Sequence, residues 1–248
     1  MGSELTYKDY VNDADHMDQY RAYQQRYATR IRESDKILLD LVGARRVQGR
    51  PTRVLDLGCS TGNFLLHLKR MAPDLALVGA DVVTSIIAGN RHNPELDGIE
   101  FREFDMLAIE PTPEFDIVVT NAALMFFTVE EFERALVNIG RMLAPGGHLV
   151  TFDLFHPFDQ SIAVVETSKH HPRGLKFHFR GHDSVRRALA QAGLHDAQFK
   201  MFSMPFDLPR SQDPSDITSY TVHTTEDERL SFRGGLYQPW CHVTAQKR

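Results

Sequence analysis

The stretch VLDLGCSTGNF, from Val54 to Phe64, decides how the rest of the chain is interpreted. An apolar run that carries one acid leads into two glycines, Gly58 and Gly62, and then into a second apolar segment. This order predicts a strand, a tight turn and a helix, because glycine tolerates the backbone angles of tight turns. Several kinds of nucleotide ligand bind on such turns, and the residues around the turn distinguish between them.

The composition of the chain limits the class of protein. Its 248 residues are 42% hydrophobic, which is ordinary for a globular protein. Its 33 acidic side chains outnumber the 28 basic ones, so we expect no nucleic-acid partner, which would favour a basic surface. No apolar run is long enough for a membrane helix, and the first residues do not resemble a secretory signal, so we expect no membrane contact. Cys59 and Cys241 fit neither a disulfide framework nor a zinc site, and we expect a cytoplasmic location.

Strand-like and helix-like segments alternate from residue 52 onward. The preceding residues, 14–48, have apolar side chains at helical spacing and predict one broken helix or two consecutive ones. The predicted strands are 53–58, 75–83, 98–105, 114–124 and 146–155, and the predicted helices are 63–73, 84–93 and 129–145. This alternation predicts βαβ units and therefore an α/β fold with a parallel sheet.

The end of the chain has a different pattern. A predicted helix at 182–194 is followed by two predicted strands, 196–208 and one long strand at 229–247. No segment between these strands is a helix long enough to cross the sheet, so we expect them to pair antiparallel at one edge.

The glycine spacing disfavours two nucleotide classes. A dinucleotide fingerprint has the form G-x-G-x-x-G, and here its three glycine positions are Gly58, Ser60 and Asn63. A triphosphate loop has lysine directly after its last glycine, and no lysine follows Gly62.

Three acids indicate a different ligand. Asp56 lies inside the first strand, where a carboxylate is costly unless loop amides or a ligand ammonium pair with it, so we expect a cationic ligand. Asp81 ends the second predicted strand, where an acid accepts hydrogen bonds from ribose hydroxyls. Asp105 ends the third, where it is placed to accept the adenine amino group while Met106 packs on the ring. The three acids line one crevice at the strand ends.

The motifs VLDLGCSTG, LVGADVV, FREFDML, FDIVVTNAALMFF and RMLAPGGHLVTFD, taken in order, resemble those of class I S-adenosylmethionine-dependent methyltransferases. The resemblance covers about residues 50–155 and, more loosely, the remainder. It implies a Rossmann-like doubly wound α/β fold, with a seven-stranded mostly parallel sheet, an antiparallel last strand and an N-terminal helical lid. It also implies one domain over 1–248, with a helical cap (1–50), a cofactor-binding core (51–155) and a substrate-side segment with the edge strands (156–248).

The resemblance implies S-adenosyl-L-methionine as cofactor and assigns residues to it. The glycine turn approaches the cofactor, Asp81 with Val82 holds the ribose, Asp105 with Met106 holds the adenine, and Asn121 with Ala122 flanks the methionine part. The turn residues concerned are Gly58, Cys59, Ser60 and Gly62. Ser60 departs from the glycine of many members, and its small side chain still permits close approach. We interpret Cys59 as a packing residue and not as a nucleophile.

The implied activity is in-line methyl transfer to O, N or C of a small molecule. Two alternatives stay open: a cyclase or lyase of the same fold that releases methylthioadenosine without an acceptor, and a tRNA or protein methyltransferase. Asn121 is not followed by two prolines, so the chain lacks the Asn-Pro-Pro motif of amino-group DNA methyltransferases. The methylation of nucleic-acid bases therefore loses support. We expect a monomer or homodimer.

Catalytic candidates are fewer, because this chemistry mainly requires alignment of the reactants. His156 and Asn121 follow the fifth and fourth strands, and His156 is the candidate base, although a structural histidine is the simpler interpretation. Tyr27 or Arg30 of the N-terminal helix is the candidate for holding the methionine carboxylate.

A polar segment, 209–230, is a candidate second lid with Tyr220 and His223 on it and Tyr237 and Trp240 near it. His170 and His171 lack nearby carboxylates at ligand spacing, so we expect no metal.

Overall fold

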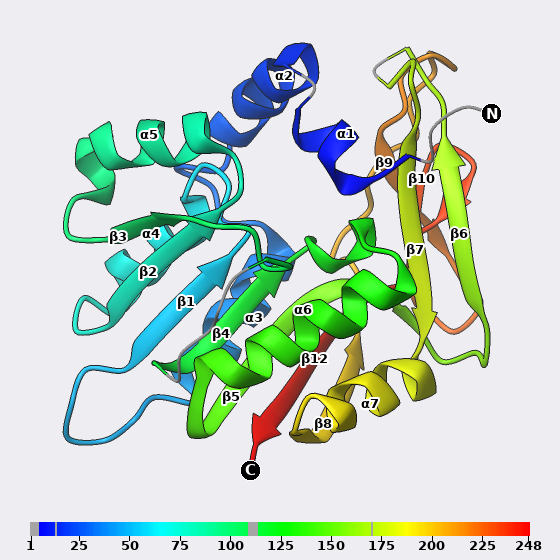
Figure 1. The fold of residues 1–248 in the computed structure, drawn as a ribbon. Helices are drawn as coiled ribbons and strands as arrows, with labels where there is room; N and C mark the ends of the chain where they lie inside the picture. Colours follow the sequence, from blue (N-terminus) through cyan, green and yellow to red (C-terminus); the bar gives the residue numbers. More distant parts are fainter. Residues whose placement is uncertain (1–4, 13, 109–113, 170) are drawn as a thin grey trace.

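A central sheet follows the order β3-β2-β1-β4-β5-β12-β8 (Figure 1). The computed structural model describes residues 5–12, 14–108, 114–169 and 171–248. The strands on this path are β1 (Arg53–Leu57), β2 (Ala76–Asp81), β3 (Glu100–Glu103), β4 (Phe115–Asn121), β5 (Leu143–His156), β8 (Leu194–Met201) and β12 (Trp240–Lys247). The path order reverses between β1 and β4, which is the switch point where open α/β sheets bind ligands.

Most pairs on the path are parallel, as predicted. β1 pairs parallel with β2 and β4, and β4 pairs parallel with β5. β12 lies antiparallel between β5 and β8, which confirms an antiparallel last strand. The long strand predicted over 229–247 is wrong, because the chain breaks at Gly234, which has φ +54°, and again at Pro239, which has no amide hydrogen for a ladder. The result is β10 (Arg229–Arg233), β11 (Leu236–Tyr237) and β12.

Helices cover both faces of the sheet because strand residues alternate between the faces. Val54 packs with one group of helices, α3 (Glu33–Gly43), α4 (Asn63–Met71) and α5 (Thr84–His92). Its neighbour Leu55 packs with α6 (Val129–Met142) and α7 (His182–Gln191) on the opposite face. Two N-terminal helices, α1 (Tyr7–Val11) and α2 (Ala14–Gln25), lie above the carboxyl ends of the strands (Figure 1). The predicted helical region 14–48 is therefore two helices, α2 and α3.

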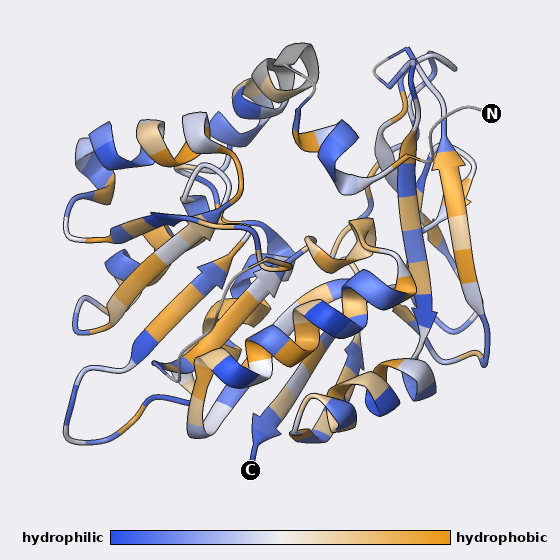
Figure 2. Cartoon of the chain, in the orientation of Figure 1, coloured by the Kyte–Doolittle hydropathy of each residue, from blue (hydrophilic) through white to orange (hydrophobic). Residues whose placement is uncertain are grey.

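Two small β units extend this core and were not predicted. β6 (Ser161–Glu166) and β7 (Leu175–Gly181) form a hairpin, and β7 joins β5 through two residues, Phe155 and His156. Figure 2 shows that apolar residues dominate β6 although it lies at the outer edge. A separate sheet consists of β9 (Ser219–His223), β10 and β11. Two 3-10 turns, η1 (Pro94–Leu96) and η2 (Leu124–Phe126), complete the described elements.

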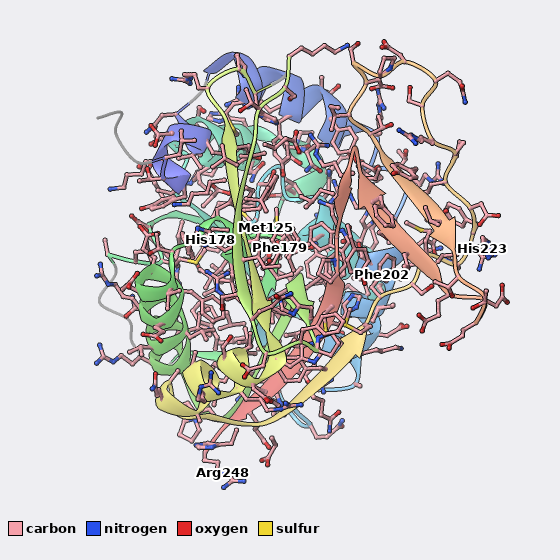
Figure 3. The ribbon with its side chains drawn as sticks, turned by 90° about the vertical axis from the view of Figure 1, so that its right-hand side faces the viewer. Met125, His178, Phe179, Phe202, His223 and Arg248 are labelled. Atoms are coloured by element: carbon pink, nitrogen blue, oxygen red, sulfur yellow. The ribbon has the colours of Figure 1, made fainter. Side chains whose placement is uncertain are left out.

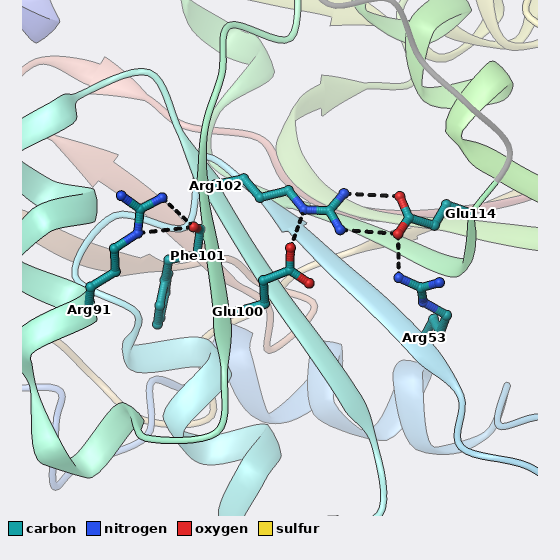
Figure 4. A network of polar contacts seen from close by, with 6 residues as sticks. All are labelled: Arg53, Arg91, Glu100, Phe101, Arg102 and Glu114. Atoms are coloured by element: carbon teal, nitrogen blue, oxygen red, sulfur yellow. Dashed lines mark hydrogen bonds and ion pairs between the residues drawn. The ribbon is translucent and has the colours of Figure 1, made fainter.

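An ion-pair network closes the end of the sheet opposite the ligand crevice (Figure 4). Glu114, just before β4, accepts hydrogen bonds from Arg53 of β1 and from both terminal nitrogens of Arg102 of β3. Arg102 also pairs with Glu100 at 2.7 Å. The hydrogen bond from Arg102 is the main reason that the pKa of Glu114 is lowered. These contacts tie β1, β3 and the start of β4 together across β2.

The contact between α6 and α7 generates a stability prediction. A Cβ added at Gly140 of α6 would stand 2.2 Å from the backbone oxygen of Ala192, which no side-chain rotation relieves. We expect Gly140→Ala to destabilise the fold by about 1–3 kcal/mol, as overpacking does. Gly89→Ala in α5 is the control, because an added Cβ there meets nothing within 4 Å and alanine favours a helix. Chemical denaturation measures both variants, and equal stabilities would contradict the packing argument.

Candidate functional site

A cavity of about 590 Å³ opens above the carboxyl ends of β1, β2 and β4. This size lies within the usual range of small-molecule sites, roughly 300–1,000 Å³. Its wall combines the ends of these strands with α1, α2 and the segment before α3. A further part of the wall comes from residues 202–240, which lie after β8 and around the small sheet. The cavity therefore brings together residues from both ends of the chain.

The glycine turn forms the floor of this cavity. Gly58, Ser60 and Gly62 have φ angles of +76°, +48° and +74°, so the turn winds through three left-handed positions. An added Cβ on Gly58 would stand 3.2 Å from the Cβ of Ala123, so this glycine serves both the angle and the close approach. Gly58 and Ser60 line the cavity, whereas Gly62 and Cys59 are not among its described lining residues.

Cys59 is buried beneath the turn. Its side chain is 5% exposed, and burial is the main reason that the pKa of its thiol is raised. This environment keeps the sulfur in the unreactive thiol form. The position fits the predicted packing interpretation.

Three carboxyl groups gather beside the turn. Asp81 lines the cavity and accepts hydrogen bonds from the amides of Ser60 and Val83, both at 3.0 Å. Asp56 is 2% exposed and lies behind the lining, and its Oδ1 has no hydrogen-bond partner among the described residues. Burial, followed by the charges of Asp35 and Asp81, raises the pKa of Asp56 to about 8. Asp81 therefore places a carboxyl group on the cavity wall, with the carboxyl group of Asp56 behind it.

Asp35 is a member of this group that the sequence analysis missed. It lies in the first turn of α3, 2% exposed, and accepts a hydrogen bond from Asn121 Nδ2 at 2.9 Å. Desolvation raises its pKa, although the nearby guanidinium of Arg32 acts in the opposite direction. The available signal in the sequence is its position next to Ser34 and just before an apolar run, which indicates only the start of a helix. Asn121 lines the cavity and is fixed by Asp35, and Ala122 beside it has φ +54°.

Asp105 also lines the cavity, but a tyrosine already contacts it. Tyr7 of α1 donates its hydroxyl hydrogen to Asp105 Oδ2 at 2.6 Å, and Asp105 Oδ1 accepts the amide of Leu107. Burial and this hydrogen bond raise the pKa of Tyr7, which stays protonated. Met106 and Val82 line the cavity as well. Tyr7 therefore ties α1 to the end of β3, a role that its isolated position in the sequence did not indicate.

The segment between α2 and α3 supplies the cations of the cavity. Arg32 stacks on the ring of Tyr27, 4.0 Å from its centroid, and donates a 2.5 Å hydrogen bond to Gln24. Arg30 lines the cavity, is exposed, and has no ion pair or hydrogen bond within the described residues. Tyr27 lines the cavity too, with its hydroxyl 3.0 Å from that of Tyr23. Of the two predicted carboxylate-binding residues, Arg30 is the one that is free to bind an anion.

His156 does not occupy the position predicted for a base. It is 3% exposed and is not among the described lining residues of the cavity. Its backbone pairs with Gly181 of β7, and its ring lies 6.0 Å from that of Phe158. Burial lowers its pKa. His156 therefore lies away from the described lining of the cavity, because β5 continues into the pairing with β7.

The candidate second lid, 209–230, is only partly at the cavity. Ser219 lines it, but Tyr220 turns away, stacking on Phe232 at 5.6 Å and donating to the oxygen of Gly234. His223 lies on the outer side of the small sheet and pairs with Asp207 (Figure 3). Trp240 does line the cavity, as does Phe202, which the sequence analysis did not single out.

No group of three or more metal-ligating side chains occurs within the part of the chain that the structure describes, and His170 lies outside that part. Among the described helices, none has the length and apolarity to cross a membrane.

Comparison with known proteins agrees with this architecture. A family model described as a methyltransferase domain matches residues 54–147, which contain the turn and all strands from β1 to β4. The chain is 38% identical to a demethylmenaquinone methyltransferase of Thermus thermophilus over 46% of its length and 53% of that protein. It is 31% identical to a malonyl-[acyl-carrier protein] O-methyltransferase of Geobacter sulfurreducens over 73% of its length and 66% of that protein. The chain belongs to the class I S-adenosylmethionine-dependent methyltransferases.

The fold of this methyltransferase extends beyond the matched segment. A methyltransferase solved in complex with the Haloferax volcanii Trm112 activator has a TM-score of 0.63 at 18% identity, covering 94% of this chain and 97% of that one. The likeness in fold therefore extends over most of the chain. The chain spans only about half the length of the first curated relatives it matches.

The raised pKa of Asp56 in this methyltransferase generates a prediction on pH and stability. Because folding raises this pKa from 3.8 to about 8, the folded chain keeps a proton on Asp56 between these pH values, whereas the unfolded chain loses it. Its contribution to stability is complete below pH 3.8 and is lost as the pH rises towards 8. We expect Asp56→Asn to remove this loss, so that its melting temperature gains on the wild type between about pH 5.5 and 8.5.

The control is Asp159→Asn at an exposed position. Its difference from the wild type should be the same at both pH values. A difference for Asp56→Asn that does not change with pH would contradict the raised pKa.

Proposed function

We propose that this chain binds S-adenosylmethionine in the cavity and transfers its methyl group to a small molecule. The observation that carries the proposal is a group of three carboxyl groups, those of buried Asp35 and Asp56 and of half-buried Asp81, beside a left-handed glycine turn. Such a wall attracts a ligand that is cationic and carries hydrogen-bond donors. A pyrophosphate would be repelled by it.

The residues fit the parts of the cofactor. Asp81 would accept the ribose hydroxyls, and Gly58 and Ser60 would leave space for the chain that joins the ribose to the sulfur. Asp105 and Met106 would contact the adenine, with Tyr7 holding the carboxylate of Asp105 in place. The lining residues Val82, Asn121 and Ala122 complete this side.

The amino acid end of the cofactor would lie near the α2–α3 segment. Asp56 Oδ1 has no hydrogen-bond partner among the described residues, so an ammonium group bound nearby, directly or through water, would favour its ionised form. Arg30 is exposed at the cavity and free to pair with a carboxylate. These two groups would orient the methionine part by opposite charges.

The cofactor supplies an activated methyl group. The acceptor atom forms the new bond to the methyl carbon while the carbon–sulfur bond breaks and its electron pair stays on sulfur, and water takes the proton that the acceptor loses. The protein aligns the two reactants, and the apolar cavity wall excludes competing water. Asn121, fixed by Asp35, would act by positioning and not by proton transfer.

The acceptor is a small molecule in this proposal, because the cavity has a volume of about 590 Å³, which is typical of small-molecule sites. The relatives do not define it further, since their names cover acceptors as different as demethylmenaquinone and malonyl-[acyl-carrier protein]. We also propose one functional domain over 1–248, because residues near both termini line the same cavity.

Product analysis tests the reaction. Incubation with S-adenosylmethionine alone should leave it intact, and a metabolite extract free of protein and nucleic acid should lead to S-adenosylhomocysteine. Release of methylthioadenosine without an acceptor would contradict methyl transfer and would support the cyclase or lyase alternative. Turnover that requires added tRNA or protein would contradict a small-molecule acceptor.

Two ligands that differ only in the amino acid end test the placement of the cofactor. We expect Arg30→Met to weaken S-adenosylhomocysteine binding by about tenfold and to leave methylthioadenosine binding unchanged, because the second ligand has no carboxylate. Asp81→Asn should weaken both ligands, since both contain the ribose. Calorimetry measures each affinity.

Arg26→Met is the matched control, because Arg26 lies just after α2 but does not line the cavity. An equal loss for both ligands in Arg30→Met would contradict the carboxylate role. Unchanged affinities in Asp81→Asn would contradict the ribose role.

A further inference from the structure

The far wall of the cavity is apolar and carries no charge. It comes from the residues that follow β8 and from the start of β12, and it meets the end of β5. Its ring and thioether members are Phe152, Phe202, Met204, Phe206 and Trp240. Its polar members are neutral: Ser219, Ser231 and Gln238. Met125 and Phe202 lie close to the centre of the molecule in Figure 3.

The charged lining residues lie elsewhere. Within the described residues they are Arg30, Arg32, Glu33, Asp81 and Asp105. All of them belong to the α2–α3 segment or to the ends of β2 and β3, where we place the cofactor. Arg233 of the small sheet forms a two-bond ion pair with Glu166 and is not a lining residue. A carboxylate against the far wall would therefore have no cation to pair with.

Aromatic rings pack against one another in the far wall. Trp240 stacks on Phe152 at 4.9 Å with 14° between the planes, and Phe202 meets Phe152 edge-on at 5.6 Å. Behind them, His242 packs on Phe152 at 4.4 Å, and its Nε2 donates to the oxygen of Ser34 at 3.1 Å. Burial lowers the pKa of His242 to about 4, so this ring is neutral near pH 7. Flat aromatic surfaces of this kind favour a planar partner.

Gln238 provides a single oriented donor in this apolar surrounding. It is 5% exposed, and its Oε1 accepts a hydrogen bond from Trp240 Nε1 at 3.3 Å. The indole nitrogen is only a donor, so this contact fixes which end of the amide is oxygen. The amide Nε2 has no hydrogen bond to any described residue, although Gln238 lines the cavity. Nε2 is not among the fully buried atoms without a partner, so it is accessible and can donate to an acceptor atom of a bound molecule.

We propose that the methyl acceptor is an uncharged planar aromatic molecule whose hydroxyl or carbonyl oxygen accepts a hydrogen bond from Gln238. The proposal rests on the proposed methyltransferase function and names its substrate class. Carboxylate acceptors are disfavoured, because burying an unpaired charge against these rings is costly.

Two probes with the same ring system test the proposal. 2-Naphthol is neutral and has one hydroxyl, whereas 2-naphthoate has a carboxylate in the same place. Calorimetry is carried out with S-adenosylhomocysteine at saturation, so that the cofactor half is filled. We expect 2-naphthol to bind at least about tenfold more tightly than 2-naphthoate.

Gln238→Leu tests the hydrogen bond. We expect it to weaken 2-naphthol about fivefold, which is the usual net value of one neutral hydrogen bond, and to leave S-adenosylhomocysteine affinity unchanged. The matched control is Gln198→Leu on the neighbouring strand β8, which is exposed and does not line the cavity. Unchanged 2-naphthol affinity in a folded Gln238→Leu protein would overturn the role of Gln238.

A measurement on the wild-type protein guards against a variant that fails to fold. Trp240 is the single tryptophan of the chain, so its fluorescence reports on the far wall alone. We expect saturable quenching by 1,4-naphthoquinone, reversed by 2-naphthol and not by 2-naphthoate. If 2-naphthoate binds as well as 2-naphthol, or neither binds while S-adenosylhomocysteine does, the substrate class is wrong. If S-adenosylhomocysteine itself does not bind, the proposed function fails instead.

Discussion

The site depends on the cost of burying Asp56. A carboxyl group in the middle of a core strand is either protonated or compensated by charge, and here it has two other acids within electrostatic range. No described residue donates a hydrogen bond to its Oδ1. The surrounding structure therefore keeps the carboxyl group of Asp56 protonated near neutral pH at the switch point of the sheet. A cationic ligand bound beside it would favour its ionised form, and the geometry of the glycine turn allows such a ligand to come close.

The helices around the site are arranged by the same group of acids. Asp35 brings the start of α3 to Asn121 at the end of β4, and Tyr7 brings α1 to Asp105 near the end of β3. Each contact joins an N-terminal helix to a strand end through one polar hydrogen bond. The helical cap is thus fastened to the residues that we propose contact the cofactor, so cofactor binding and the position of the cap are expected to depend on each other.

The sequence predicted the parts of the molecule that repeat local patterns. The strands from β1 to β5 and the helices between them follow from hydrophobic periodicity, and Gly58, Asp81 and Asp105 follow from their spacing after those strands. Asp35 and Tyr7 could not be found in this way, because their partners lie 86 and 98 residues away. The position of His156 has a related cause, since the continuation of β5 into a pairing with β7 is a tertiary event.

The two halves of the cavity also differ in how far they can be predicted from the sequence. The cofactor half uses charges and left-handed turns, which are rare inside strands and therefore visible in a sequence. The far wall uses neutral residues such as Phe202 and Gln238, which are ordinary in any core, and it is assembled only when β12 inserts antiparallel between β5 and β8. Because the last strand breaks at Pro239, Gln238 lies between β11 and β12, where it lines the cavity. An acceptor that is recognised by shape and by one neutral hydrogen bond leaves little trace in the sequence, so its class has to be inferred from the assembled wall.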